Sequence, residues 1–251
     1  MVGRIDYQAM APRYDRGRDL RLEDLDDWRK AIAPFVPPRA RIGDIGSGTG
    51  TFARAFVEWF PDATVLAVEP SAAIRAAAAA KGEHSRIELR EGAAEHVPAT
   101  EASLDVAWLS AVVHHVDRRA TARALVRALA PGGHLLLRGA WPGRTDRITL
   151  FRYFPAAAEM LARTYPQLPT VIAELEEAGF RFVVDAAVPQ RSADDLADLA
   201  DKAATRADSS LTRITDEEFA SGLARLRAAA ARDVERAPVI DWLDLVVFMR
   251  P

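Results

Sequence analysis

Three closely spaced glycines, followed by a carboxylate about 20 residues later, are the features of this chain that point most clearly to chemistry. The segment Asp44–Gly50 reads DIGSGTG, with glycine at 46, 48 and 50. Glycine allows a tight turn and a close approach of the backbone to a ligand, which a Cβ would prevent. Glu69 ends the next apolar run, where a carboxylate can accept hydrogen bonds from both hydroxyls of a ribose. Together these residues predict a site for a ligand that contains adenosine.

The glycine spacing and the preceding acid distinguish between two such ligands. A dinucleotide fold uses G-x-G-x-x-G so that a helix N-terminus faces the pyrophosphate, whereas this turn reads G-x-G-x-G. Asp44 lies just before the turn, where it would repel a pyrophosphate and would suit a cationic amine. S-adenosylmethionine carries adenosine, an ammonium group and a sulfonium, and it has no phosphate. The motif therefore favours S-adenosylmethionine over a nicotinamide dinucleotide.

Two adjacent histidines are the candidates for acid–base chemistry. His114 and His115 follow the fourth expected strand, at the carboxyl edge where open α/β sheets bind ligands. Methyl transfer from a sulfonium gains most from alignment and exclusion of water, and a general base helps where the acceptor is a hydroxyl or an acidic carbon. Neighbouring side chains cannot both face one substrate, so we expect at most one to act, and the alternative is that both only pack at a loop. The remaining histidines (His84, His96 and His134) lie on other elements, so no metal site is predicted.

Strands and helices alternate along roughly the first half of the chain. The helix expected at 20–35 places Leu25, Trp28, Ile32 and Phe35 on one face. Such alternation argues for a parallel sheet covered by helices on both faces. A Pro-Gly-Gly turn is expected to lead into the fifth strand. The strands are expected at 41–45, 63–69, 86–90, 104–109 and 134–138, with further helices at 51–60, 71–81 and 118–130.

The rhythm changes after Trp141. A helix is expected at 170–178 and strands at 180–188 and 239–249, and the segments 142–169 and 190–237 interrupt the pattern. We predict that these two segments are caps over an active site, and the alternative is that they are surface helices. Four aromatic residues either line an acceptor pocket or complete the core: Trp108, Trp141, Tyr153 and Phe154. The predicted organisation is a single domain over 1–251, with an N-terminal helical lid (1–38), a cofactor-binding core (39–140) and a C-terminal half (141–251).

Composition excludes several classes of protein. The 251 residues are 49% hydrophobic and include 33 basic and 36 acidic residues in an interspersed pattern, which disfavours a nucleic-acid partner. The chain has no cysteine, so disulfides, thiolate metal sites and cysteine nucleophiles are excluded. The N-terminus lacks the apolar core of a signal peptide, and the apolar runs are shorter than the ~20 residues of a membrane span. We therefore expect a cytoplasmic protein without a membrane partner.

The chain resembles the class I S-adenosylmethionine-dependent methyltransferases, in particular the group of ubiquinone and menaquinone biosynthesis methyltransferase-like proteins. The resemblance extends from Tyr14 to Arg138. It implies a Rossmann-like α/β fold with a seven-stranded, mostly parallel sheet, an antiparallel last strand and helical cap insertions. The motifs that carry it lie at 42–50, 65–71 (VLAVEPS), 91–95 (EGAAE), 105–116 (DVAWLSAVVHHV) and 127–138 (RALAPGGHLLLR).

The resemblance also implies roles for individual residues. Asp44 and Gly46 address the methionine end of the cofactor, Glu69 the ribose, and Leu109 offers a backbone carbonyl to the methionine amine. The adenine edge is addressed through the backbone of Ala94, because this chain has alanine at 93 where many members have Asp, Ser or Thr. The other residues expected around the cofactor are Ser47, Gly48, Gly50, Pro70, Glu95 and Ser110.

An N-terminal lid is implied by the sequence YDRGR at 14–18. Tyr14 and Arg18 would close over the methionine carboxylate, and the alternative is a surface turn with an ordinary ion pair. The expected reaction moves a methyl group to an O, N or C atom of a small-molecule metabolite and leaves S-adenosylhomocysteine. Three alternatives stay open: a non-methylating, cyclase-like enzyme that binds S-adenosylmethionine, an NAD-dependent oxidoreductase, and a nucleic-acid methyltransferase. The sequence is compatible with a homodimer.

Overall fold

The computed structural model of this chain describes residues 20–251, and it divides into two compact units. The first, which we call the sheet unit, comprises 28–139, 166–187 and 244–251. The second, the helical unit, comprises 140–165 and 188–243 together with the described residues before Trp28. The chain therefore passes between the units several times, and each unit is built from segments that are far apart in sequence.

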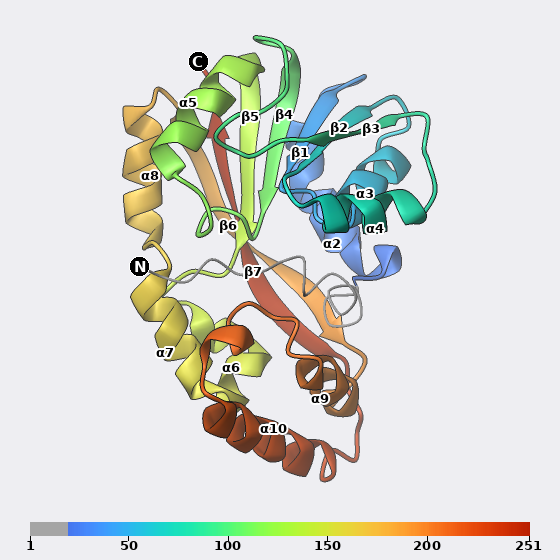
Figure 1. The fold of residues 1–251 in the computed structure, drawn as a ribbon, viewed down its shortest axis with the longest axis vertical. Helices are drawn as coiled ribbons and strands as arrows, with labels where there is room; N and C mark the ends of the chain where they lie inside the picture. Colours follow the sequence, from blue (N-terminus) through green and yellow to red (C-terminus); the bar gives the residue numbers. More distant parts are fainter. Residues whose placement is uncertain (1–19) are drawn as a thin grey trace. The chain divides into compact units, whose positions relative to one another are not determined.

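The sheet confirms the expected architecture (Figure 1). Its strand order is β3-β2-β1-β4-β5-β7-β6. Neighbours from β3 to β5 pair in parallel, whereas β7 runs antiparallel to β5. The strands are β1 (Arg41–Ile45), β2 (Thr64–Glu69), β3 (Ile87–Glu91), β4 (Leu104–Ser110), β5 (Leu129–Gly139), β6 (Arg181–Ala193) and β7 (Val239–Met249).

Helices cover both faces of the sheet unit (Figure 1). On one face, Trp108 of β4 is fully buried and packs against Trp28, Phe52 and Phe56. On the other face, apolar side chains of β4 and β5 meet α5 and α8. The helices of this unit are α3 (Thr51–Trp59), α4 (Ala72–Ala80), α5 (Arg118–Ala128), α8 (Leu168–Glu177) and most of α2 (Asp26–Ile32).

Three expected elements differ in the structure, and the first is β6, which extends to Ala193 instead of ending at 188. The helix expected at 20–35 is a 3-10 turn (Leu22–Leu25), the α-helix α2 and a second 3-10 turn (Ala33–Phe35). Pro34 has no N–H to donate and its ring collides with the preceding turn, so the α-helix ends before it. The strand β5 begins at Leu129 rather than at His134, and its register with β4 shifts between Leu104 and Val106. The Pro-Gly-Gly segment is thus an irregularity inside the strand rather than a turn before it.

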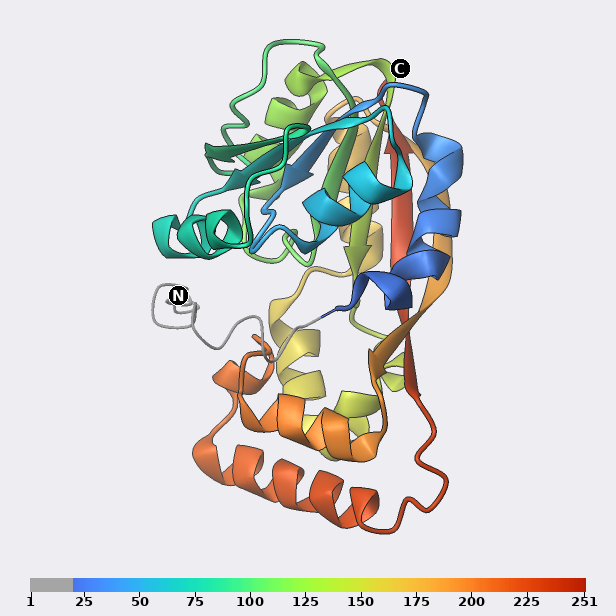
Figure 2. The same ribbon diagram turned by 90° about the vertical axis from the view of Figure 1, so that its right-hand side faces the viewer.

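The helical unit has its own hydrophobic core, built around Phe154 and Leu226. Gly222 of α10 lies so close to Phe154 that an added Cβ would be 2.3 Å from the ring. The helices α9 and α10 lie side by side (Figure 2). The segments expected as caps therefore combine into one compact unit, and their position over an active site stays a prediction. The helices of this unit are α6 (Thr149–Tyr153), α7 (Pro155–Thr164), α9 (Leu196–Ala204) and α10 (Asp216–Ala230).

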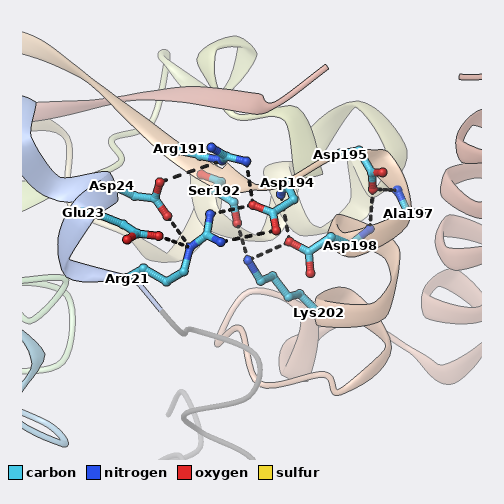
Figure 3. A network of polar contacts seen from close by, with 10 residues as sticks. All are labelled: Arg21, Glu23, Asp24, Arg191, Ser192, Asp194, Asp195, Ala197, Asp198 and Lys202. Atoms are coloured by element: carbon cyan, nitrogen blue, oxygen red, sulfur yellow. Dashed lines mark hydrogen bonds and ion pairs between the residues drawn. The ribbon is translucent and has the colours of Figure 1, made fainter. Parts of the chain in front are cut away.

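A polar network within the helical unit connects the described N-terminal residues to the junction of β6 and α9, as Figure 3 shows. Arg21 contacts Asp24 at 2.7 Å and Asp194 at 2.6 Å, and Arg191 also contacts Asp194 at 2.7 Å. Lys202 contacts Asp198 at 3.0 Å one turn along α9. Because Arg21 and Asp194 are half exposed, each pair adds little free energy of folding, and together they fix the path of the chain into α2.

Candidate functional site

The glycine-rich turn connects β1 to α3. Gly46, Gly48 and Gly50 have φ values of 75°, 57° and 82°, in the left-handed region that favours glycine. The backbone nitrogens of Gly46 and Ser47 both donate to the carbonyl of Val68 on β2, at 2.7 Å and 3.0 Å. A Cβ on Gly46 would lie 2.5 Å from a methyl group of Val112. The turn therefore requires glycine at this position for both its conformation and its packing.

Glu69 faces this turn. It ends β2, the parallel neighbour of β1, and one of its oxygens accepts a hydrogen bond of 3.1 Å from the backbone of Gly48. Its other oxygen accepts from the backbone of Ser71 at 2.9 Å, and the side chain is largely buried. Burial raises the pKa of Glu69, and the two backbone donors oppose that rise. A carboxylate has about four acceptor positions, so two remain for further donors such as ribose hydroxyls.

Asp44 is a buried acid on β1 next to the turn. Burial raises its pKa to about 7, the backbone N–H of Ala53 acts in the opposite direction, and repulsion from Glu69 adds to the rise. Its Oδ2 atom is buried and has no hydrogen-bond partner among residues 20–251, and the same is true of the Ser47 hydroxyl. A buried acceptor without a donor is costly. A ligand with a cationic amine would satisfy it, so the residues present fit the amino-acid end of S-adenosylmethionine.

The segment expected at the adenine follows β3. Gly92 is tightly enclosed, because an added Cβ would lie 2.9 Å from both Val68 and Pro98. Ala94 is buried, and Glu95 accepts a hydrogen bond of 2.9 Å from the backbone of Asp117. The structure therefore places Glu95 at the start of α5, directly after the buried Ala94.

Arg75 of α4 is a residue that sequence reasoning missed. Its guanidinium donates to the backbone carbonyls of Glu69 and Pro70, both at 2.8 Å, and to the carboxylate of Glu91 at 2.6 Å. Glu69 and Glu91 are register partners on β2 and β3. Arg75 thus holds the ends of these strands together beside the turn. An arginine in an alanine-rich helix carries no motif that would have indicated this contact.

The loop after β4 carries the two histidines. Leu109 is buried and Ser110 is half-buried at the end of the strand, and Ala111 then adopts a φ of 57°. His114 is half-buried, His115 is exposed, and their rings are 3.9 Å apart between centroids. Val112 of the same loop packs on the glycine turn. The structure therefore brings the histidine loop against the turn and places the two rings against each other.

Several expected residues take no place in this cluster. Tyr14 and Arg18 lie outside the described residues. Trp108 belongs to the core of the sheet unit, and Phe154 belongs to the core of the helical unit. Within the described part of the chain, no group of three His, Asp or Glu side chains could hold a metal ion, and no helix is long and apolar enough to cross a membrane.

Comparisons with known proteins agree with this geometry. A family model described as a methyltransferase domain matches residues 43–137. The ubiquinone/menaquinone biosynthesis C-methyltransferase UbiE of Rubrivivax gelatinosus is 32% identical over 134 residues. That match covers 52% of this chain and 52% of the relative, so the chain spans about half the length of this curated relative.

Solved structures extend the likeness beyond the matched domain. A putative methyltransferase from an antibiotic biosynthesis pathway of Anabaena variabilis is 25% identical with a TM-score of 0.70, covering 91% of this chain and 98% of that chain. The [4+2]-cyclase SpnF is 16% identical with a TM-score of 0.67, covering 98% of this chain and 94% of that chain. The second likeness concerns the fold alone, because its identity is low.

Proposed function

We propose that this chain, which belongs to the class I S-adenosylmethionine-dependent methyltransferases, transfers the methyl group of S-adenosylmethionine to a small-molecule acceptor. The observation that carries the proposal is the position of Glu69, whose carboxylate contacts the backbone of Gly48 while Asp44 is buried beside the same turn. The negative charges of a pyrophosphate would be repelled by these two acids. An adenosine that carries an amino acid would instead offer ribose hydroxyls and an ammonium group, which both acids can bind.

The cofactor contacts that we propose follow from this arrangement. Glu69 accepts hydrogen bonds from the ribose, with Pro70 directly after it, and the buried oxygen of Asp44 binds the ammonium group. The carbonyl of Leu109 is a second acceptor for the amine, next to Ser110. The backbone of Ala94, beside Glu95, contacts the adenine edge. The turn from Gly46 through Ser47 and Gly48 to Gly50 lets the backbone approach the cofactor closely.

The bound cofactor supplies an electrophilic methyl group on its sulfonium. The chain then has to hold the acceptor in line with that methyl group and to exclude water, which accounts for a large share of such catalysis. Where the acceptor is a hydroxyl or an acidic carbon, we propose that either His114 or His115 takes its proton. The two residues are adjacent in the chain with their rings 3.9 Å apart between centroids, and we propose that only one of them acts as the base.

The acceptor that we propose is a small metabolite, and transfer to O, N or C is compatible with the site. The relative from Rubrivivax gelatinosus is named a C-methyltransferase of quinone biosynthesis, which makes an acidic ring carbon the first acceptor to test. The interspersed charges and the net charge of −3 speak against a nucleic-acid acceptor, whose binding depends on basic surface.

Calorimetry with the purified chain tests the cofactor proposal. We expect S-adenosylhomocysteine to bind and NADH to give no appreciable heat. Binding of NADH without binding of S-adenosylhomocysteine would instead support the oxidoreductase alternative.

Transfer itself is tested with S-adenosylmethionine labelled on its methyl group and a metabolite extract. Mass spectrometry should then detect a metabolite that has gained one labelled methyl group. A cyclase has the same fold, so a non-methylating activity is the alternative that this experiment tests. Cofactor binding without any labelled product, across extracts that contain the candidate acceptors, would favour that alternative.

A further inference from the structure

The histidine loop, residues 111–116, is held by the rest of the sheet unit at both of its ends. At its start, the backbone N–H of Ala111 donates to the carbonyl of Arg138 on β5 at 2.8 Å. At its end, the backbone N–H of Asp117 donates to the side chain of Glu95 at 2.9 Å. The first contact joins backbone to backbone, whereas the second depends on a side chain. A substitution of Glu95 can therefore release one end of the loop while the other end stays fixed.

The end of the histidine loop is also the beginning of α5. The side chain of Asp117 accepts a hydrogen bond of 2.9 Å from the backbone of Ala120 and so caps this helix. A capping side chain satisfies one of the backbone N–H groups that the first helical turn leaves without a partner. The backbone N–H of Asp117 itself lies before the helix, and Glu95 is its acceptor. Glu95 thus fixes the point at which the loop becomes helix.

The segment that carries Glu95 is held by contacts of its own. Near the far end of α5, the guanidinium of Arg127 donates to the carbonyls of Val97 and Ala99, at 2.9 Å and 2.8 Å. On the other side of Glu95, the surroundings of Gly92 leave no room for a Cβ. Because these contacts do not involve the carboxylate of Glu95, the segment should keep its position when that carboxylate is removed.

We propose that Glu95 is a positioning residue, which sets the place of the histidine loop through the backbone of Asp117. The inference rests on the proposed function, because the place of the loop matters to the reaction only where the loop faces the acceptor. Val112 of this loop lies against the glycine turn, where a Cβ on Gly46 would meet it at 2.5 Å. A loop released at Asp117 therefore disturbs the proposed site. Since a small misplacement of reacting groups slows a reaction, Glu95 affects turnover without contact to a reacting atom.

Amide hydrogen exchange, measured by NMR on the full chain without ligand, tests the hold on the loop. The backbone N–H of His115 donates to the carbonyl of Val112 inside the loop at 2.8 Å, so its exchange rate reports on the loop itself. In Glu95→Ala we expect the amides of both Asp117 and His115 to exchange about 3- to 10-fold faster than in the unaltered chain, the size expected for the loss of one hydrogen bond. A merely local contact would change the exchange of Asp117 alone.

Matched variants separate the loss of the acceptor from the loss of charge. Glu95→Gln removes the charge and keeps an acceptor oxygen, so we expect both amides to exchange within about twofold of their rates in the unaltered chain. Glu101→Ala removes an exposed carboxylate from the same connection between β3 and β4, and it should change neither rate. Should Glu95→Ala not fold, Glu95→Asp takes its place, because the shorter side chain withdraws its oxygens from Asp117.

The effect on the reaction is measured with S-adenosylmethionine labelled on its methyl group and a metabolite extract. In Glu95→Ala we expect the maximal rate of label transfer to fall about 10-fold, because the alignment of the reactants is impaired. The KM for S-adenosylmethionine should change by less than about threefold, since the segment that holds Ala94 keeps its position. Glu95→Gln should restore the rate.

The possible outcomes separate this inference from the proposed function. Unchanged exchange of His115 in Glu95→Ala would overturn the inference, as would faster exchange with an unchanged rate of label transfer. Failure of Glu95→Gln to restore the rate would also overturn it, since the charge rather than the hydrogen bond would then matter. Absence of any label transfer by the unaltered chain would overturn the proposed function instead, and the exchange of His115 would still decide whether Glu95 holds the loop.

Discussion

Glu69 lies 3.1 Å from the backbone nitrogen of Gly48, a residue 21 positions earlier in the chain, and accepts its hydrogen. The two meet because β1 and β2 are parallel neighbours whose carboxyl ends lie at one edge of the sheet. The carboxylate is therefore fixed in position before any ligand arrives. Such preorganisation lowers the entropy that binding would otherwise lose.

Replacement of this carboxylate should weaken cofactor binding. Glu69→Gln removes the negative charge and turns one acceptor into a donor, so we expect the affinity for S-adenosylhomocysteine to fall about 10- to 100-fold. Calorimetry measures the change. Glu83→Gln is the matched control, because Glu83 is exposed in the same unit, and its affinity should equal that of the unaltered chain. Equal affinities of the unaltered chain, Glu69→Gln and Glu83→Gln would show that Glu69 does not bind the cofactor.

The pH dependence of cofactor binding should report on Asp44. Burial raises the pKa of its carboxyl to about 7, and only the ionised form attracts an ammonium group. Affinity for S-adenosylhomocysteine should therefore rise with pH through about 7 and fall up to tenfold per unit below it. Asp44→Asn should bind weakly at every pH. A steep rise that persists in Asp44→Asn would assign the titration to another group.

The same substitution should stabilise the free protein. A carboxyl whose folded pKa is raised holds its proton in the folded state between its unfolded value and about 7, so its contribution to stability decreases as pH rises through that window. At pH 8 the folded chain carries a buried charge that Asp44→Asn lacks. We expect the variant to gain about 1 to 3 kcal/mol in free energy of unfolding by denaturant titration. A loss of stability at pH 8 would contradict this account of Asp44.

A methyl group at Gly46 should destabilise the sheet unit more than one at Gly82. Both glycines have positive φ, but a Cβ on Gly46 would meet Val112 at 2.5 Å and a Cβ on Gly82 would meet nothing within 4 Å. Gly82→Ala isolates the cost of the backbone conformation, about 1 kcal/mol. Gly46→Ala adds the collision of the new Cβ with Val112, so we expect it to lower the free energy of unfolding by about 1 to 3 kcal/mol more than Gly82→Ala does. Similar unfolding midpoints for the two variants would show that the loop of Val112 can move away from the new Cβ without loss of stability.

Single substitutions of the two histidines should have unequal effects. If one imidazole takes a proton from the acceptor, its replacement by Asn should lower kcat by about 100-fold or more and remove a limb of the pH–rate profile near neutrality. The other replacement should change kcat by less than about tenfold. The measurement requires the acceptor found by the labelling experiment. Small effects in both His114→Asn and His115→Asn would mean that alignment alone supports the reaction.

Gly222 offers a test of packing against helix propensity in the helical unit. Alanine is the better helix former by about 1 kcal/mol, so propensity alone predicts that Gly222→Ala stabilises α10. The ring of Phe154 would lie 2.3 Å from the new Cβ, and we therefore expect a net loss of about 1 to 3 kcal/mol. Phe154→Leu in the same background should recover part of that loss. A higher unfolding temperature for Gly222→Ala would contradict the packing.

The local elements of the first half of the chain could be predicted from the sequence. The strand at Arg41–Ile45 and the cap at Ser71 agree with the structure because periodicity and capping act between near neighbours. The α-helix before β1 is shorter than the periodicity predicts, because Pro34 ends it although the stripe of apolar residues continues to Phe35. The extension of β5 back to Leu129 depends on pairing with Leu104, which a single strand sequence does not reveal.

The candidate site was predictable only where a motif marks it. Asp44, the glycines and Glu69 lie together as expected, and their roles toward a ligand stay predictions. Arg75 was missed, because a basic residue in an alanine-rich helix normally indicates an exposed side chain. Its partners lie on β2 and β3, so only the assembled sheet reveals them.

The place of β7 has a consequence for biosynthesis. This strand follows all the other strands of the sheet in sequence, yet it lies between β5 and β6. Until it has emerged from the ribosome, β5 presents an open ladder of N–H and C=O groups, of the kind that recruits other chains. A nascent chain stalled before Val239 should therefore be prone to aggregation and dependent on chaperones.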